Sequence, residues 1–324
     1  MPSLKAIRKR ISSVKSTQKI TRAMKMVAGA KLNKAQLRIT ELRPYAVKVQ
    51  EVLWEITRDA AAAPAVEAPA AEGIGADGHA AAPPAGREKL SHPLLVSRPE
   101  RRVLLLVLTS DRGLCGAFNT NVNKRAEREW LSRVEAGQEV QLAIIGRKGR
   151  DYFARRNAPI LEYIPGVWEK LGLETAQAVG AKLLAPLNKN EIDAIYIVYN
   201  EFKSAISQTV VVERLLPAGG PPQDQAEGGD PGAQGGRTSE FMYEPDRGAL
   251  LERLVPMYVD ISILRALYES MASELGAKLT AMDAANKNAK EVIDTLTLEY
   301  NKARQAAITK ELMEIIGGSE TLKE

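Results

Sequence analysis

The chain has 324 residues, 45% of them hydrophobic and 26% charged, with a formal net charge of +5, as in an ordinary globular protein with room for a core and an extension. No apolar run approaches the roughly 18 residues that a membrane span requires. A single cysteine, Cys115, excludes an internal disulfide and a thiolate metal cluster, and the two histidines, His79 and His92, lie far from paired carboxylates, so we expect no metal site.

The first 56 residues carry a heptad repeat. Steps of three and four visit Leu4, Ile7, Ile11, Val14, Gln18, Thr21, Lys25, Ala28, Leu32, Ala35, Ile39, Leu42, Ala46, Val49, Leu53 and Ile56. Only Gln18, Thr21 and Lys25 are not apolar. The repeat predicts a long helix in a left-handed coiled coil, about 80–90 Å long at about 1.5 Å per residue. Pro44 should kink this helix, because its ring disturbs the hydrogen bond to Thr40.

The same segment is strongly basic, with eleven Lys or Arg and no Asp or Glu in the first forty residues. A transit peptide could look similar, but the heptad repeat is unbroken and contains no small-residue cleavage site, so we interpret the segment as mature protein. The basic stripe fits a solvated helix face, a nucleic-acid footprint or a contact with an acidic protein surface. It lacks interleaved aromatic residues and any groove-reading motif, which disfavours nucleic acid.

Two segments rich in Ala, Pro and Gly interrupt the chain, at residues 59–88 and 217–237. They contain too few large apolar groups to pack, so we expect solvated loops without a binding site.

Residues 101–216 alternate between short apolar runs and longer amphipathic stretches. We expect strands at 102–109, 140–145, 160–163, 194–199 and 209–215, and helices at 121–135, 148–156 and 174–187. This alternation predicts a Rossmann-like α/β domain with a mostly parallel sheet that is covered on both faces. The last two strands have only a short connection, which allows an antiparallel edge.

The loop after the first strand, residues 109–119, lies where this fold class often binds nucleotides. It lacks both the dinucleotide and the phosphate-loop glycine patterns. Cys115 has no histidine nearby in sequence to activate it, so a nucleophile is not expected. We find no catalytic constellation in the chain and expect no cofactor.

We therefore interpret this loop as a structural turn. Its residues are Asp111, Arg112, Gly113 and Gly116. The glycines should allow a sharp change of direction, with Asn119 or Thr120 as the N-cap of the next helix and with Asp111 and Arg112 paired across the turn.

A second heptad repeat lies near the carboxyl end. It visits Ile261, Leu264, Tyr268, Met271, Leu275, Lys278, Met282, Ala285, Ala289, Val292, Leu296, Glu299, Ala303 and Ala306. This helix leans acidic, which favours pairing with the basic first helix. We expect residues 3–57 and 257–316 to form one antiparallel coiled coil with both free ends together at the tip, so that, for example, Val14 faces Ala303.

The expected organisation has five parts. They are a first helix (1–58), an insert and linker (59–100), the α/β domain (101–216), a second insert (217–240) and a second helix (241–324).

Six stretches form specific motifs. They are residues 16–28 (STQKITRAMKMVA), 43–45 (RPY), 110–119 (SDRGLCGAFN), 241–245 (FMYEP), 299–312 (EYNKARQAAITKEL) and 314–316 (EII). In this order they resemble the gamma subunit of F-type ATP synthase, and they cover both ends and the middle of the chain.

The resemblance implies a central rotor shaft with no catalytic site of its own. In this family one gamma subunit stands in a ring of three alpha and three beta subunits, and its α/β domain sits with the epsilon subunit on the ring of membrane-embedded c subunits. Ion flow turns the c ring and gamma turns with it, which couples rotation to ATP synthesis and, in reverse, to hydrolysis. The resemblance implies no nucleic-acid partner and a membrane contact only through the c ring. The expected location is the cytoplasmic face of a bacterial plasma membrane or, alternatively, a chloroplast or cyanobacterial thylakoid.

The resemblance also implies which residues touch the alpha/beta ring. Carried over from the family motifs, these are Met24, Arg304, Gln305 and Thr309. To them we add four lysines whose charge could meet acidic loops on beta: Lys9, Lys15, Lys25 and Lys278. For any single lysine, an ordinary exposed helix surface is the alternative.

The two inserts depart from the compact bacterial pattern of the family. The second one lies where chloroplast gamma subunits carry a regulatory insert that depends on a cysteine pair, and one cysteine cannot form that bridge. We expect a neutral spacer, because Gly-rich loops lengthen at little thermodynamic cost; a steric brake on hydrolysis is the alternative.

Two other classes of protein fit parts of the sequence. A nucleic-acid-binding coiled coil would explain the basic stripe, and its binding would weaken steeply with salt. A long-armed structural tether would explain the two helices, but such a protein usually has an ATPase head with a phosphate loop, which this sequence lacks.

Overall fold

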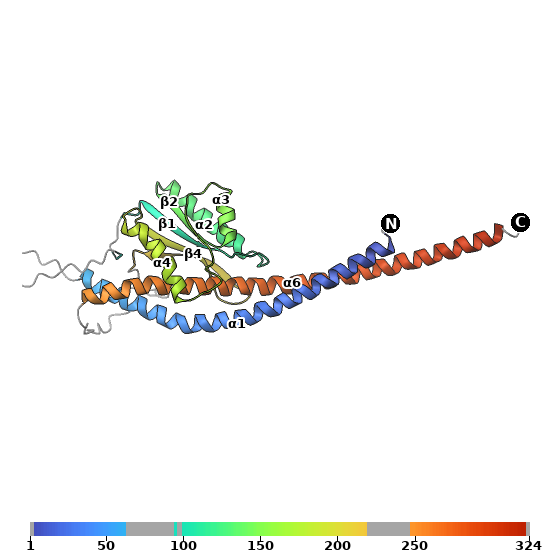
Figure 1. Cartoon of the computed structure of the whole chain (residues 1–324), viewed down its shortest axis with the longest axis horizontal. Coiled ribbons are helices and arrows are strands. Elements are labelled where there is room, and N and C mark those ends of the chain that lie inside the picture. Colours follow the sequence, from blue (N-terminus) through green and yellow to red (C-terminus); the bar gives the residue numbers. More distant parts are fainter. Residues whose placement is uncertain (1–2, 63–93, 96–98, 219–246, 322–324) are drawn as a thin grey trace, which may run out of the picture.

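The computed structural model describes residues 3–62, 94–95, 99–218 and 247–321. Two long helices lie side by side, and a sheet domain sits against the half of the pair that is remote from the chain ends (Figure 1). His79, His92 and nearly all of the two predicted inserts fall outside the described residues. The first four residues of the predicted insert 59–88 are described and continue the first helix, since alanine is a strong helix former.

The long helices are α1 (Leu4–Ala62) and α6 (Arg247–Thr321), and they pair antiparallel, as predicted. Two contacts fix the direction: Lys25 Nζ lies 2.6 Å from Asp283 Oδ1, and Arg43 Nε lies 3.2 Å from Glu269 Oε1. Every predicted seam position of α1 is buried or half-buried, which confirms the heptad prediction for this helix. Pro44 lies inside α1 without ending it, and the helix is bowed in the half that contains this residue (Figure 1).

The prediction that both free ends meet at the tip is wrong. The carboxyl end of α6 extends well past the amino end of α1 (Figure 1). From the Lys25–Asp283 contact, counting 21 residues back to residue 4 and 21 forward from residue 283 places the end of α1 opposite residue 304. The same count places Val14 opposite residue 294, so the predicted pairing of Val14 with Ala303 is wrong too. About 17 residues of α6, roughly 25 Å at 1.5 Å per residue, extend beyond the pair.

The seam of α6 also differs from the prediction after Ala289. Val292 is 42% exposed, and the predicted seam residues Glu299 and Ala306 are exposed as well. Of the later predicted seam residues, Leu296 is buried and Ala303 is half-buried, as predicted, whereas Ile293 and Tyr300, which were not predicted, are half-buried as well. A straight α-helix has 3.6 residues per turn and drifts by about 20° per heptad from a 3.5-residue repeat, which moves the contact line by one residue over this length.

The sheet domain has the predicted topology. Its strands are β1 (Arg102–Leu108), β2 (Glu139–Ile145), β3 (Ile160–Ile164), β4 (Ala194–Phe202) and β5 (Gln208–Leu216), and its helices are α2 (Phe118–Glu135), α3 (Arg147–Ala154) and α4 (Leu173–Asn188). The strand order is β3-β2-β1-β4-β5, with parallel pairing throughout except for the antiparallel edge strand β5. The Rossmann-like α/β prediction and its antiparallel edge are confirmed.

The two faces of the sheet are covered differently. Alternation along β1 sends Leu104, Leu106 and Leu108 to one face and Val103, Leu105 and Val107 to the other. The first face packs against α4, α6 and the carboxyl-terminal half of α1, whereas the second packs against α2 and α3. As a result, α6 is buried on nearly all sides from Ile261 to Ala277, and the largest core of the protein joins the sheet domain to the coiled coil.

Candidate functional site

The predicted contact residues lie at three levels along the coiled coil. Nearest the free end are Lys9, Arg304, Gln305 and Thr309, and all four are exposed. The described part of α1 ends near this level, and the polar side chains of α6 are exposed here together with apolar ones such as Ile308.

The middle level holds Lys15, Met24 and Lys25. Lys15 is exposed and Met24 is half-buried. Lys25 forms an interhelical ion pair with Asp283, and this hydrogen bond, together with a second one from Lys287, lowers the pKa of the Asp283 carboxyl. The structure therefore already uses the charge of Lys25 to join α1 and α6.

The third level holds Lys278 and the predicted turn, which the structure brings together. Lys278 is only 17% exposed and pairs with Glu274 at 2.7 Å. Gly116 has a φ of +55°, and a Cβ atom there would lie 3.9 Å from both the Ala277 carbonyl and the Ala281 side chain. The loop after β1 is thus held against α6 beside Lys278.

The inside of this loop differs from the prediction. The N-cap of α2 is Ala117, so a cap at Asn119 or Thr120 is wrong. Asn119 lies in the first turn of α2, where its Oδ1 accepts a hydrogen bond of 3.0 Å from the Ser110 backbone N–H and its Nδ2 donates to Ser110 Oγ at 2.8 Å. A side chain that folds back onto the preceding loop serves the same purpose as a cap, because it closes the turn.

The two charged residues of the turn do not pair with each other in the described structure. The Asp111 carboxylate accepts a hydrogen bond of 2.9 Å from the Arg147 backbone N–H at the start of α3. A carboxylate at this position interacts favourably with the amino end of a helix. Arg112 is exposed, and a Cβ atom added at Gly113 would lie 4.0 Å from the side chain of Lys148.

Cys115 is buried beneath this loop and packs with Phe118 and Ala277. Burial raises the pKa of the Cys115 thiol, and the nearby Glu274 carboxylate raises it further. Because the reactive form of cysteine is the thiolate, a thiol with a raised pKa is a poor nucleophile. The packing of this residue accounts for its position.

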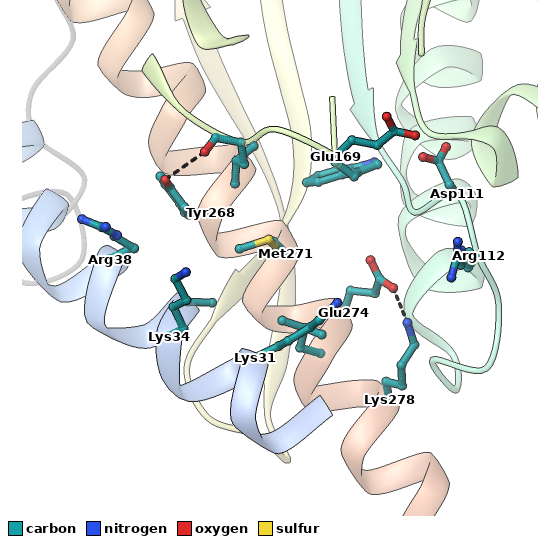
Figure 2. Close-up of a pocket in the computed structure, with 14 residues that line it drawn as sticks. Lys31, Lys34, Arg38, Asp111, Arg112, Glu169, Tyr268, Met271, Glu274 and Lys278 are labelled. Atoms are coloured by element: carbon teal, nitrogen blue, oxygen red, sulfur yellow. Dashed lines mark hydrogen bonds and ion pairs between the residues drawn. The ribbon is translucent and has the colours of Figure 1, made fainter. Parts of the chain in front are cut away.

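A cavity of about 670 Å³ lies where α1, α6 and two loops of the sheet domain meet (Figure 2). Apolar side chains such as Met271 and Leu275 line it beneath a charged rim. The charged lining residues are Lys31, Lys34, Arg38, Asp111, Arg112, Glu169, Glu274 and Lys278. Cations outnumber anions among them, so the cavity favours an acidic group over a basic one.

Two of the charged side chains in the cavity neutralise each other. Glu274 and Lys278 are paired with each other, as Figure 2 shows, and the lining contains no histidine or cysteine. Within the described parts of the chain, no group of three or more metal-ligating side chains comes together.

The sequence did not predict the contact that ties together the two sheet-domain loops lining this cavity, the loop after β1 and the loop after β3. The Trp168 indole N–H donates to the Thr109 carbonyl at 2.9 Å, which ties the loop after β3 to the end of β1. Gly146 has a φ of +96°, and a Cβ atom there would lie 2.0 Å from the Thr109 carbonyl oxygen. A glycine directly after a buried strand is a signal for such a close approach, although its neighbour in space is not visible in the sequence.

None of the helices in the described part of the chain contains an apolar stretch that is long enough to cross a membrane.

Comparisons with known proteins agree with one another. A family model described as ATP synthase matches residues 3–322. The ATP synthase gamma chain of Sorangium cellulosum is 85% identical over the full length of both chains, and that of Anaeromyxobacter sp. (strain Fw109-5) is 46% identical, again over both full lengths.

Solved structures show the same fold at lower identity. A chain in the OSCP/F1/c-ring structure of Euglena gracilis mitochondrial ATP synthase is 21% identical with a TM-score of 0.61, and the match covers 98% of this chain and 94% of that one. A chain in the central stalk/c-ring structure of the Tetrahymena thermophila enzyme is 23% identical with a TM-score of 0.55, covering 82% of this chain and 99% of that one. On the strength of the family model and the two full-length relatives, this chain belongs to the ATP synthase gamma-chain family.

Proposed function

We propose that this chain is the central rotor shaft of an F-type ATP synthase. It couples ion-driven rotation of a membrane c ring to conformational change at the catalytic sites of an alpha/beta ring, for ATP synthesis and, in reverse, for hydrolysis. It has no catalytic site of its own. The observation that carries the proposal is the pair of long helices that extends from the sheet domain and in which α6 continues past the end of α1, in a member of the gamma-chain family.

The faces of the two-helix rod differ from one another, as a shaft that acts on several sites requires. A two-helix rod presents a basic α1 and a more acidic α6 in different directions, so three identical catalytic sites around it meet different surfaces at one moment. A shaft can shift the equilibrium of a site only by the difference in its contact energy with the alternative states. Full switching of a site requires about 5.5 kcal/mol of such a difference.

The proposed partners follow from the family. They are three alpha and three beta subunits, one epsilon subunit and the c ring, with one copy of this chain in each complex, no nucleic acid, and a membrane contact only through the c ring. Structures with the same fold are described as the central stalk or rotor of ATP synthases. Because the two relatives described above are bacterial, we propose a peripheral location on the cytoplasmic face of a bacterial plasma membrane.

The contacts with the alpha/beta ring are proposed to lie at the free end and along the outer surface of the coiled coil. We propose that these contacts are made by the exposed side chains of Lys9, Lys15, Arg304, Gln305 and Thr309 and by the half-buried side chain of Met24. Lys25 and Lys278 are already paired within the chain, so we propose smaller contributions from them. We propose that the turn formed by Asp111, Arg112, Gly113 and Gly116 is a structural part of the shaft surface and makes no contact with the alpha/beta ring.

Co-purification with alpha, beta and epsilon chains tests the role directly, and charge reversal tests the contacts. In a complex carrying Arg304→Glu and Gln305→Glu, we expect normal assembly and a rate of ATP synthesis at least about 10-fold lower, as the loss of about 1.4 kcal/mol of contact energy would produce. Lys290→Glu, an exposed change on the same helix outside the proposed contacts, is the matched control. Wild-type synthesis in the double variant would contradict the contact assignment, and failure of this chain to co-purify with the ring would contradict the role.

A further inference from the structure

A cluster of polar side chains joins the sheet domain to the coiled coil; most of its members are buried or nearly buried beside the apolar core, and Arg43, at its edge, is 46% exposed. We call it the polar joint. It comprises Tyr199 of β4, Glu213 of β5, Arg265 and Glu269 of α6, and Arg43 of α1. It does not belong to the cavity described above or to the proposed contact surface.

Glu213 is the centre of the joint. Its Oε2 accepts a hydrogen bond of 2.9 Å from the Tyr199 hydroxyl, and its Oε1 accepts from Arg265 Nη2. The Glu213 and Arg265 side chains are only 11% and 17% exposed. Burial by itself would lower the pKa of Arg265, but Glu213 together with Tyr199, Glu269 and Tyr258 outweighs burial, so the pKa of Arg265 is raised. Arg265 therefore stays charged, and its charge is paired with the edge strand of the sheet.

Arg43 brings the second helix into the joint. Its Nε donates to Glu269 Oε1 at 3.2 Å, and its Nη2 donates to the main-chain carbonyl of Phe202 at 3.0 Å. One guanidinium of α1 thus holds both α6 and the end of β4. Four residues further along α6, Ser273 Oγ donates to the Asn200 carbonyl at 3.1 Å.

These contacts lie in a line along α6, because Arg265, Glu269 and Ser273 follow one another at intervals of four residues. This row of contacts opposes rotation of α6 about its own axis relative to the sheet. Apolar packing alone does this poorly, since hydrophobic attraction is not directional. A buried ion pair, in contrast, is satisfied in one geometry, and separating its partners leaves uncompensated charge in the core.

Buried side-chain atoms with no hydrogen-bond partner in the described part of the protein occur within the joint, at Arg265 Nε and Glu269 Oε2, and at residues adjacent to its members in sequence, at Ser270 Oγ and Asn200 Nδ2. Each such atom lowers stability relative to an apolar side chain of similar size. A seam built for stability alone would not contain them. Their presence at this seam fits a part whose purpose is to fix orientation.

We propose that the polar joint is the element that transmits torque between the sheet domain and the coiled coil, with Arg265 as its positioning residue. The proposal rests on the rotor role given above. Torque that enters the sheet domain at the base would twist it around α6, and the joint keeps the two at one angle. Without it, the apolar seam still holds the parts together but lets them roll.

The test replaces the joint with apolar residues of similar volume, a change that often leaves a fold stable. The variant is Tyr199→Phe with Glu213→Leu and Arg265→Met. A matched control exists on the far face of the sheet, where Glu127 accepts hydrogen bonds of 2.7 Å from Tyr152 and 2.6 Å from Arg156 between α2 and α3, away from both long helices. The control variant is Tyr152→Phe with Glu127→Leu and Arg156→Met.

The first measurement uses the isolated full-length chain. Spin labels on exposed positions of α2 and α6, through Ser132→Cys and Glu291→Cys in a Cys115→Ala background, report the distance distribution between the sheet domain and the shaft. We expect one narrow distribution in the parent chain and in the control, and a broad one in the joint variant. If the joint variant is too unstable to measure, Tyr199→Phe alone removes one hydrogen bond and should give a smaller broadening. An unchanged distribution in a folded joint variant would overturn the proposal.

The second measurement uses the assembled complex in membrane vesicles. We expect unloaded ATP hydrolysis to be unchanged and ion pumping per ATP hydrolysed to fall about 3-fold or more in the joint variant, with no change in the control. A broader distance distribution in the joint variant with unchanged ion pumping per ATP hydrolysed would overturn the proposed role in torque transmission. If the parent chain supports no rotation-coupled activity, the rotor proposal fails, and the spin-label result alone then decides whether the joint fixes the orientation.

Discussion

Leu32 offers the sharpest measure of how strongly the coiled coil and the sheet domain stabilise each other. It is 4% exposed and packs with Ala35 and Ile39 of its own helix, with Leu275 of α6 and with Phe202 of β4. Leu32→Ala removes three carbons from this cluster, about 2.4 kcal/mol at about 0.8 kcal/mol per carbon. The cavity left behind adds to that loss, and such substitutions cost about 2–5 kcal/mol in total. We expect the free energy of unfolding to fall by about 3 kcal/mol.

Leu37→Ala is the matched control, five residues further along the same helix. Leu37 is 65% exposed, so the same chemical change with the same helix propensity should alter the free energy of unfolding by less than about 0.5 kcal/mol. Urea unfolding of the full-length chain, followed by circular dichroism, gives both values, and amide exchange of residues 28–39 shows where protection is lost. If the two variants differ by less than about 1 kcal/mol, Leu32 does not belong to the core that joins the three elements.

Two further predictions concern the register and the pH dependence. Cysteines at Val14 and Ile293 should cross-link within the chain under mild oxidation whereas cysteines at Val14 and Ala303 should not, and the reverse result would contradict the register fixed by Lys25 and Asp283. Burial raises the pKa of the Glu269 carboxyl despite the nearby Arg43, so stability should fall as pH rises from the unfolded value, about 4.3, through the higher folded one. Glu269→Gln should therefore melt at a higher temperature than the parent at pH 7 and at a similar one at pH 4; equal shifts at both values would count against a raised pKa.

The heptad repeat predicted the first helix fully and the second one only in part, for a physical reason. In α1 all but three of the seam positions are apolar, and most of the residues between them are charged, polar or small, so the repeat marks one seam. In α6, Val292 and Ile293 are adjacent β-branched residues, and the pattern alone cannot decide which one faces inward. The drift between 3.5 and 3.6 residues per turn selects Ile293 only after the partner helix is in place.

The sequence pattern also could not predict how far α6 extends past the end of α1. Both helices keep an apolar repeat to their ends, but the repeat states only that a surface is apolar, not whether this chain or another one covers it. The register follows from specific contacts such as Lys25 with Asp283, which sequence periodicity does not specify.

The cavity and the polar joint also could not be predicted from the sequence. The cavity brings together Lys31, Trp168 and Met271, which lie far apart in the chain, and only the docking of the sheet domain on the coiled coil makes them neighbours. Arg265 lies on a helix with charged residues on its outer face, and in sequence it looks like one of them. Its burial results from β5 covering that face, and a side chain that is charged and buried acquires its partner only through tertiary structure.

The end of α6 that extends past α1 gives the strongest physical reason to expect that this chain acts with a partner. Beyond the end of α1 its exposed apolar side chains are Ile308, Leu312, Met313, Ile315 and Ile316. At about 100° per residue they spread over about 160° of the helix surface, wider than the stripe that a single partner helix covers. A single helix of this length gains little stability in water without packing. A surrounding partner that contacts the helix from several sides would cover these side chains, whereas one added helix would leave part of them in water.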